Sequence, residues 1–84
     1  MRVVFTAAAS KQFAKLPRRT MIAIDDALAR LALDPRDPAA DVKRLQDRAD
    51  YRLRVGEWRV IFGWQPPDTL MVTAVGSRQS IYRR

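Results

Sequence analysis

Residues 51–64 read YRLRVGEWRVIFGW, in which apolar side chains recur at every second position on both sides of a Gly56-Glu57 pair, separated mostly by arginines. Alternation with a period of two is typical of a β-strand, and glycine at the first position of a two-residue loop fits a type II′ hairpin. The stretch therefore predicts two antiparallel strands, in a register that places Val55 opposite Trp58 and Tyr51 opposite Phe62.

The hairpin register separates the side chains into two faces. Arg54 lies directly opposite Arg59, and Arg52 shares their face beside Ile61. Like charges in opposed positions cost about 0.2–1 kcal/mol. Either a polyanion covers this face, because guanidinium groups bind phosphate bidentately, or the face is solvated and Glu57 or a loop aspartate pairs with the arginines. The other face is apolar and comprises Tyr51, Leu53, Val55, Trp58, Val60 and Phe62.

The chain before the hairpin predicts a strand and two helices. Arg2–Phe5 is a short apolar strand, and Thr6 can cap the helix that follows it. Pro17 stops this helix, because proline has no backbone N–H, and it suits the first turn of a second helix. Asp34-Pro35 ends the second helix. The apolar stripe of the second helix consists of Met21, Ile24, Leu28 and Leu31.

Two further segments flank the hairpin. Residues 35–50 are rich in Pro, Asp, Ala and Arg, and we expect a polar connecting loop there. Residues 65–68, QPPD, break the chain again, and the β-branched and apolar residues 69–75 predict a third strand that ends at Gly76-Ser77. The predicted fold is of the α+β class, with an N-terminal strand and a two-helix hairpin packed on a small antiparallel sheet.

Composition narrows the classes of function. The chain has 84 residues, which suits one small domain, and a net charge of +7, which suits a polyanionic partner or simply gives a basic surface. It contains neither cysteine nor histidine, so it lacks the commonest general base and the usual zinc ligands. No stretch approaches the roughly 20 apolar residues of a membrane span. We expect a cytoplasmic protein without a metal, cofactor or membrane partner.

The order of these elements resembles the RelE/ParE superfamily of toxins from bacterial type II toxin–antitoxin pairs. The residues that carry the resemblance are the paired basic residues before the hairpin turn, the G-x-aromatic-R after it, and the R-x-x-x-Y in the final VGSRQSIYRR. The resemblance covers residues 1–84 as a single toxin domain. It implies a RelE-like fold, which agrees with the fold predicted from the residue pattern.

In RelE-like members the open sheet face holds messenger RNA in the ribosomal A site, and a 2′-hydroxyl attacks the adjacent phosphate. The resemblance implies catalytic roles for Arg52, Arg54, Arg59, Arg78 and Tyr82. It implies RNA binding by Arg52, Arg54, Arg59, Arg78 and Arg83. Alternatively, Arg78 pairs with an aspartate or caps the last strand, and Tyr82 packs under the sheet edge.

The chain departs from the family pattern at the general base. The best-known ribonuclease members have lysines at the paired positions, whereas this chain has Arg52 and Arg54. Arginine is a poor base because its guanidinium group stays protonated at any working pH. Other members use Glu and His, but the only glutamate here is Glu57, in the hairpin turn, and there is no histidine. The residues therefore leave the base unassigned.

Three functions fit this resemblance. The first is a metal-independent, ribosome-dependent mRNA endoribonuclease that blocks translation and arrests growth, with the ribosome and mRNA as partners. The second is a non-enzymatic ParE-like toxin that inhibits DNA gyrase. The third is an antitoxin-binding protein whose toxicity has been lost. All three imply a cognate antitoxin protein as a partner.

Overall fold

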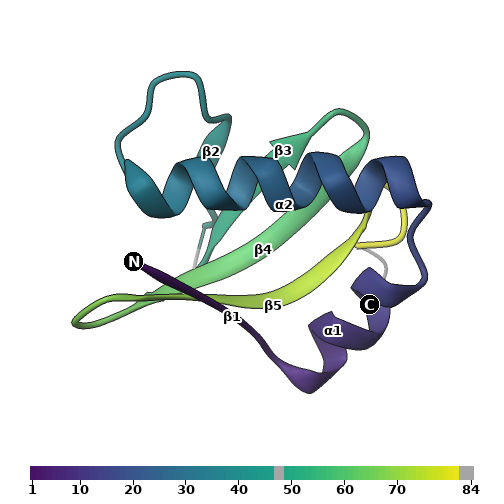
Figure 1. Cartoon of the computed structure of the whole chain (residues 1–84), viewed down its shortest axis with the longest axis horizontal. Coiled ribbons are helices and arrows are strands. Elements are labelled where there is room, and N and C mark those ends of the chain that lie inside the picture. Colours follow the sequence, from purple (N-terminus) through teal and green to yellow (C-terminus); the bar gives the residue numbers. More distant parts are fainter. Residues whose placement is uncertain (47–48, 82–84) are drawn as a thin grey trace.

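The computed structural model describes residues 1–46 and 49–81. The elements in these ranges are β1 Arg2–Phe5, α1 Ala7–Ala14, α2 Arg18–Leu33, β2 Val42–Arg44, β3 Tyr51–Val55, β4 Trp58–Gln65 and β5 Thr69–Ser77. The strands form one sheet in the order β1-β5-β4-β3-β2, in which β1 pairs with β5 in parallel and every other pairing is antiparallel. Figure 1 shows α2 crossing one face of this sheet, with α1 beside one end of β5, and the α+β class is confirmed.

The two helices begin and end close to the predicted residues. The Thr6 side chain accepts a hydrogen bond from the Ala9 backbone N–H at 3.2 Å and so caps α1. Pro17 is the N-cap residue of α2, and Asp34 is its C-cap residue. The predicted apolar stripe faces the core; Met21 is half-buried, and the fully buried members are Ile24, Leu28 and Leu31.

The predicted hairpin register is confirmed residue for residue. Tyr51 pairs with Phe62, and Val55 with Trp58. Gly56 has a φ of 61°, the positive value that the first position of a type II′ turn needs. Phe62 is fully buried, with its ring centroid 5.7 Å from that of Tyr51 and 5.2 Å from that of Trp64. The apolar hairpin face therefore forms the centre of the core beneath α2.

The prediction that residues 35–50 form only a loop is wrong. Val42–Arg44 forms β2, which pairs with β3 so that Val42 lies opposite Leu53 and Lys43 opposite Arg52. A strand of three residues with one apolar side chain is too short to produce a recognisable alternation. Its existence depends on a neighbouring strand that satisfies its backbone groups.

The third strand is longer than predicted, because β5 runs through Gly76 to Ser77 instead of ending at residue 75. The register shifts beside Ile61, which pairs with Ala74 while the next residue of β4 pairs with Val72. Thr73 is the extra residue of this bulge, and its hydroxyl donates to the Ile61 carbonyl at 3.3 Å. A bulge reverses the alternation of side chains. It therefore places Gly76 next to the arginine-bearing face of β4.

Candidate functional site

The face of the sheet opposite α2 carries two rows of basic residues. In the first row, Arg54 of β3 is paired with Arg59 of β4, and Gly76 of β5 follows without a side chain. In the second row, Lys43 of β2 is paired with Arg52 of β3. Sequence reasoning missed Lys43 because it missed β2. Only the pairing of strands assigns this lysine to the basic face.

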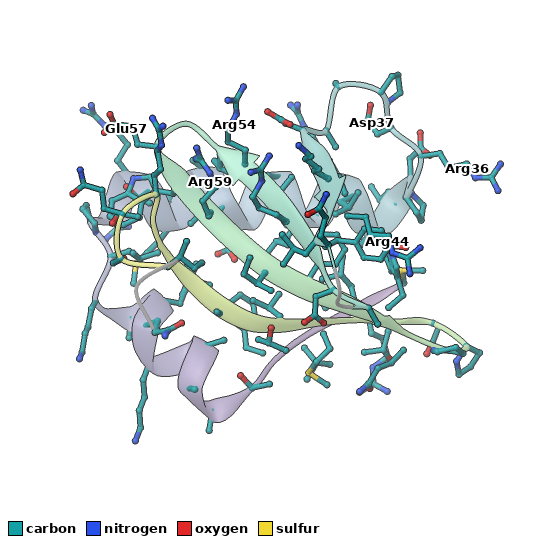
Figure 2. All side chains as sticks on the ribbon, turned by 180° about the vertical axis from the view of Figure 1, so that it is seen from behind. Arg36, Asp37, Arg44, Arg54, Glu57 and Arg59 are labelled. Atoms are coloured by element: carbon teal, nitrogen blue, oxygen red, sulfur yellow. The ribbon has the colours of Figure 1, made fainter. Side chains whose placement is uncertain are left out.

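A hollow of about 440 Å³ lies at the end of this face, around the β3–β4 turn. Figure 2 shows the labelled side chains of Arg54, Glu57 and Arg59 at that end of the sheet. Arg54 of β3, Arg59 of β4 and Arg78, which follows β5, all line the hollow. The hollow is large enough for a phosphate group and part of its nucleotide. The lining residues are Arg54, Gly56, Glu57, Arg59, Ser77, Arg78 and Gln79.

Arg59 lies on the predicted face but is buried rather than open, with only 7% of its surface exposed. Its Nη1 donates to the carbonyl oxygens of Gly56 at 3.0 Å and Trp58 at 3.1 Å, so the hairpin turn holds the guanidinium. Its Nε is buried and has no hydrogen-bond partner among the residues that the structure describes. A buried donor without a partner is costly, and an anion in the hollow would satisfy it.

Arg54 is held differently. Its Nε lies 2.5 Å from Oδ2 of Asp41, and the two side chains are 54% and 45% exposed. The Arg54 backbone N–H also donates to the Asp41 carbonyl at 2.9 Å. An exposed ion pair of this kind contributes about 0–1 kcal/mol, so an incoming phosphate can compete for this arginine at little cost. The loop aspartate that sequence reasoning allowed as a partner for the arginines is therefore present for Arg54.

Arg78 and Glu57 complete the hollow from the ends of their strands. The Arg78 backbone N–H donates to the Glu57 carbonyl at 2.9 Å, which joins the end of β5 to the β3–β4 turn. Arg52 does not line the hollow; it is half-buried, and its Nε is buried without a partner among the described residues. Tyr82 and Arg83, the remaining predicted site residues, lie outside the described residues.

The acidic side chains and the helices were both compared with known structural requirements, for a metal site and for a membrane span. No three Asp or Glu side chains within residues 1–46 and 49–81 are grouped so that they could hold a metal ion. Over the same ranges, neither helix is long and apolar enough to cross a membrane.

Comparison with known families places the chain in a class. Residues 3–82 match the family of the ParE toxin of type II toxin–antitoxin systems, parDE. The chain therefore belongs to this family within the RelE/ParE superfamily, and it is the toxin of a type II toxin–antitoxin system. No sequence among the curated proteins matches it.

Solved structures share the fold at low sequence identity. The RelB–RelE antitoxin–toxin complex from Methanococcus jannaschii contains a chain that matches with a TM-score of 0.79 and 23% identity, over 95% of each chain. The RelE–RelB complex from Pyrococcus horikoshii OT3 matches with a TM-score of 0.77 and 23% identity, over 94% of this chain and 96% of that one. The isolated E. coli RelE toxin matches with a TM-score of 0.73 and 19% identity, over 96% and 89%. The fold is therefore that of RelE toxins.

Proposed function

We propose that this toxin is a metal-independent, ribosome-dependent endoribonuclease that cuts messenger RNA in the ribosomal A site. The observation that carries the proposal is the convergence of Arg54, Arg59 and Arg78 on one hollow. Three arginines line this hollow, and the Nε of Arg59 is buried without a partner among the described residues, so the hollow suits a phosphodiester.

The reaction is an attack of a ribose 2′-oxygen on the adjacent phosphorus. The O2′–P bond forms, the P–O5′ bond breaks, and the products are a 2′,3′-cyclic phosphate and a 5′-hydroxyl. Arg59 and Arg78 stabilise the negative charge that develops on the phosphorane oxygens, and Arg59 is already oriented by the turn carbonyls before the substrate arrives. Arg52 and Arg83 bind the neighbouring backbone, and Tyr82 stacks on a base.

Glu57 supplies the base that the sequence pattern left unassigned. Among the described residues that line the hollow, Glu57 is the only acidic one, and it lies in the turn between the strands that carry Arg54 and Arg59. We assign it the removal of the 2′-proton, because the arginines stay protonated at neutral pH and cannot accept that proton. The departing 5′-oxygen then takes a proton from water.

Primer extension on mRNA in a purified translation system tests the proposal. Arg78→Ala should slow A-site cleavage about a hundredfold, the usual cost of losing one donor to a developing oxyanion. Glu57→Gln keeps the size of the side chain and should abolish cleavage while leaving RNA binding intact. Lys11→Ala is the control, because Lys11 is exposed on α1. Intact mRNA with the wild-type toxin would overturn the proposal.

One observation favours a second function, inhibition of DNA gyrase by a non-enzymatic mechanism. The matching family is described as the ParE toxin of parDE systems, and arginines at both paired positions serve binding as well as catalysis. A supercoiling assay with purified gyrase separates the two functions. Inhibition by the wild-type toxin, together with intact mRNA in the translation assay, would replace the ribonuclease proposal.

Both functions require a cognate antitoxin, and we propose an acidic or amphipathic segment that lies across the helices and covers the basic face. The net charge of +7 and the matched RelB–RelE complexes, which contain an antitoxin together with a toxin, support this partner. A ligand that binds only the folded state at 100 times its Kd adds about 2.7 kcal/mol of stability. An unfolding midpoint that does not rise when the antitoxin is added would contradict this proposal.

A further inference from the structure

The chain leaves β5 through a short turn that is closed by two serines. The Ser77 side chain accepts a hydrogen bond from the Ser80 backbone N–H at 3.1 Å, and the Ser80 side chain accepts one from the Ser77 backbone N–H at 3.1 Å. The Ser77 hydroxyl donates to Ser80 Oγ at 3.0 Å, and the Ser80 hydroxyl donates to the Ser77 carbonyl at 3.4 Å. This reciprocal pattern is that of a capping box, with serine in place of the usual glutamate.

The residues enclosed by this box include Arg78. Its backbone N–H is bound to the Glu57 carbonyl at 2.9 Å, and the Ile81 backbone N–H donates to the Ser77 carbonyl at 3.0 Å. The turn is thus fixed at both of its ends, and its middle contributes a guanidinium to the hollow. Without the hydrogen bonds of this turn, an exposed arginine beyond the last strand would sample many conformations. Binding of RNA would then cost the conformational entropy of fixing it.

Gly76 makes room for the turn. A Cβ atom at this position would lie 2.9 Å from Ser80 Oγ and 3.6 Å from Ile81 Cβ. The first distance is shorter than real contacts allow, so any side chain at residue 76 would push the Ser80 hydroxyl out of the box. The close approach of Ser80 therefore explains why a glycine occupies this position in a strand that is otherwise mostly β-branched and apolar.

We infer that Ser80 is a positioning residue of the toxin's anion site, which holds Arg78 in the hollow through the Ser77–Ser80 box. The inference rests on the proposed function for its biological role, although the positioning itself is a property of the fold. Ser80 touches no substrate in this scheme. Its effect on RNA passes entirely through the guanidinium of Arg78.

The test is a double-mutant cycle with a fluorescein-labelled octauridylate as the probe. Ser80→Ala should raise the Kd about fivefold, because it removes the hydroxyl's hydrogen bonds to the turn. In an Arg78→Ala background the same substitution should change the Kd less than about twofold. Ser80→Thr keeps the hydroxyl and should bind like the wild type. Ser10→Ala, at an exposed position on α1, is the matched control.

A second measurement separates positioning from function. The backbone order parameter of the Arg78 amide should fall from about 0.85, the value of rigid backbone, to below about 0.6 in Ser80→Ala. A fall in the order parameter without any oligonucleotide binding by the wild-type toxin would uphold the positioning and overturn the hollow as a site for free RNA, whereas the ribonuclease is decided by the primer-extension assay. An unchanged order parameter, or the same loss of affinity in both backgrounds of the cycle, would overturn the role of Ser80.

Discussion

Replacement of Lys43 tests whether β2 extends the basic face into a track for several phosphates. Lys43 has no contact with the hollow and reaches the face only through its pairing with Arg52. Each phosphate that a cation neutralises on a single strand contributes about −0.7 to the slope of log K against log salt. The cations of the face and its hollow are Lys43, Arg52, Arg54, Arg59 and Arg78.

The magnitude follows from that count. With Arg83, which the proposed function also assigns to the RNA backbone, these five cations make six contacts and give a slope of about −4.2, which Lys43→Ala should reduce to about −3.5. Between 50 and 200 mM salt, the affinity of the wild type should therefore fall about 340-fold, and that of the variant about 130-fold. The difference between the two proteins should be largest at low salt and should shrink as salt rises.

The assay is fluorescence anisotropy of a labelled octauridylate, titrated with each protein at four or more KCl concentrations. Lys11→Ala is the matched control, because it removes the same charge from α1, which carries none of the five cations. It should lower affinity only through net charge and leave the slope within about 0.2 of the wild type. Equal slopes for Lys43→Ala and Lys11→Ala would refute the reasoning that strand pairing places Lys43 on the nucleic-acid track.

Three further predictions concern binding and stability. Asp41→Asn should leave the free energy of unfolding within about 1 kcal/mol in urea titrations, because the Arg54 pair is exposed. It should tighten octauridylate binding about twofold, the effect of removing a unit charge roughly 8 Å from a phosphate in water. Phe62→Ala should cost about 3–5 kcal/mol in urea, whereas Ile22→Ala, at a position 54% exposed, should cost little. Gln12→Leu should cost about 1–3 kcal/mol by thermal unfolding, because Gln12 Oε1 accepts a β5 backbone N–H at 2.8 Å; Gln12→Glu keeps the acceptor and should cost less.

The sequence predicted the hairpin fully because its two signals agree. The period of two fixes which side chains share a face, and Gly56 fixes the loop length, so together they determine the register. The helices were predictable for a similar reason, since Thr6 marks the start of α1 and Pro17 marks the corner between α1 and α2. In each case the deciding interactions are local in sequence.

The parts that sequence reasoning missed depend on distant partners. β2 is a strand because it pairs with β3, and no residue pattern within Val42–Arg44 indicates a strand. The bulge at Thr73 arises from the fit between β4 and β5. Without it, the alternation along β5 would not place Gly76 beside Arg59. The grouping of Arg78 with Arg54 and Arg59 follows from that fit and was not available from spacing alone.

Arg54 and Arg59 lie directly opposite each other, yet the fold makes them chemically different. Arg59 is oriented by two carbonyl oxygens, which fix its position without cancelling its charge, so its full positive charge is available to a phosphate. Arg54 is paired with a carboxylate, which cancels much of its charge until a stronger anion displaces it. This division also explains how the like-charged pair persists in the free protein: one partner is neutralised and the other is held by the turn. A site built in this way favours a polyanion that occupies both positions over a single anion that must compete with Asp41.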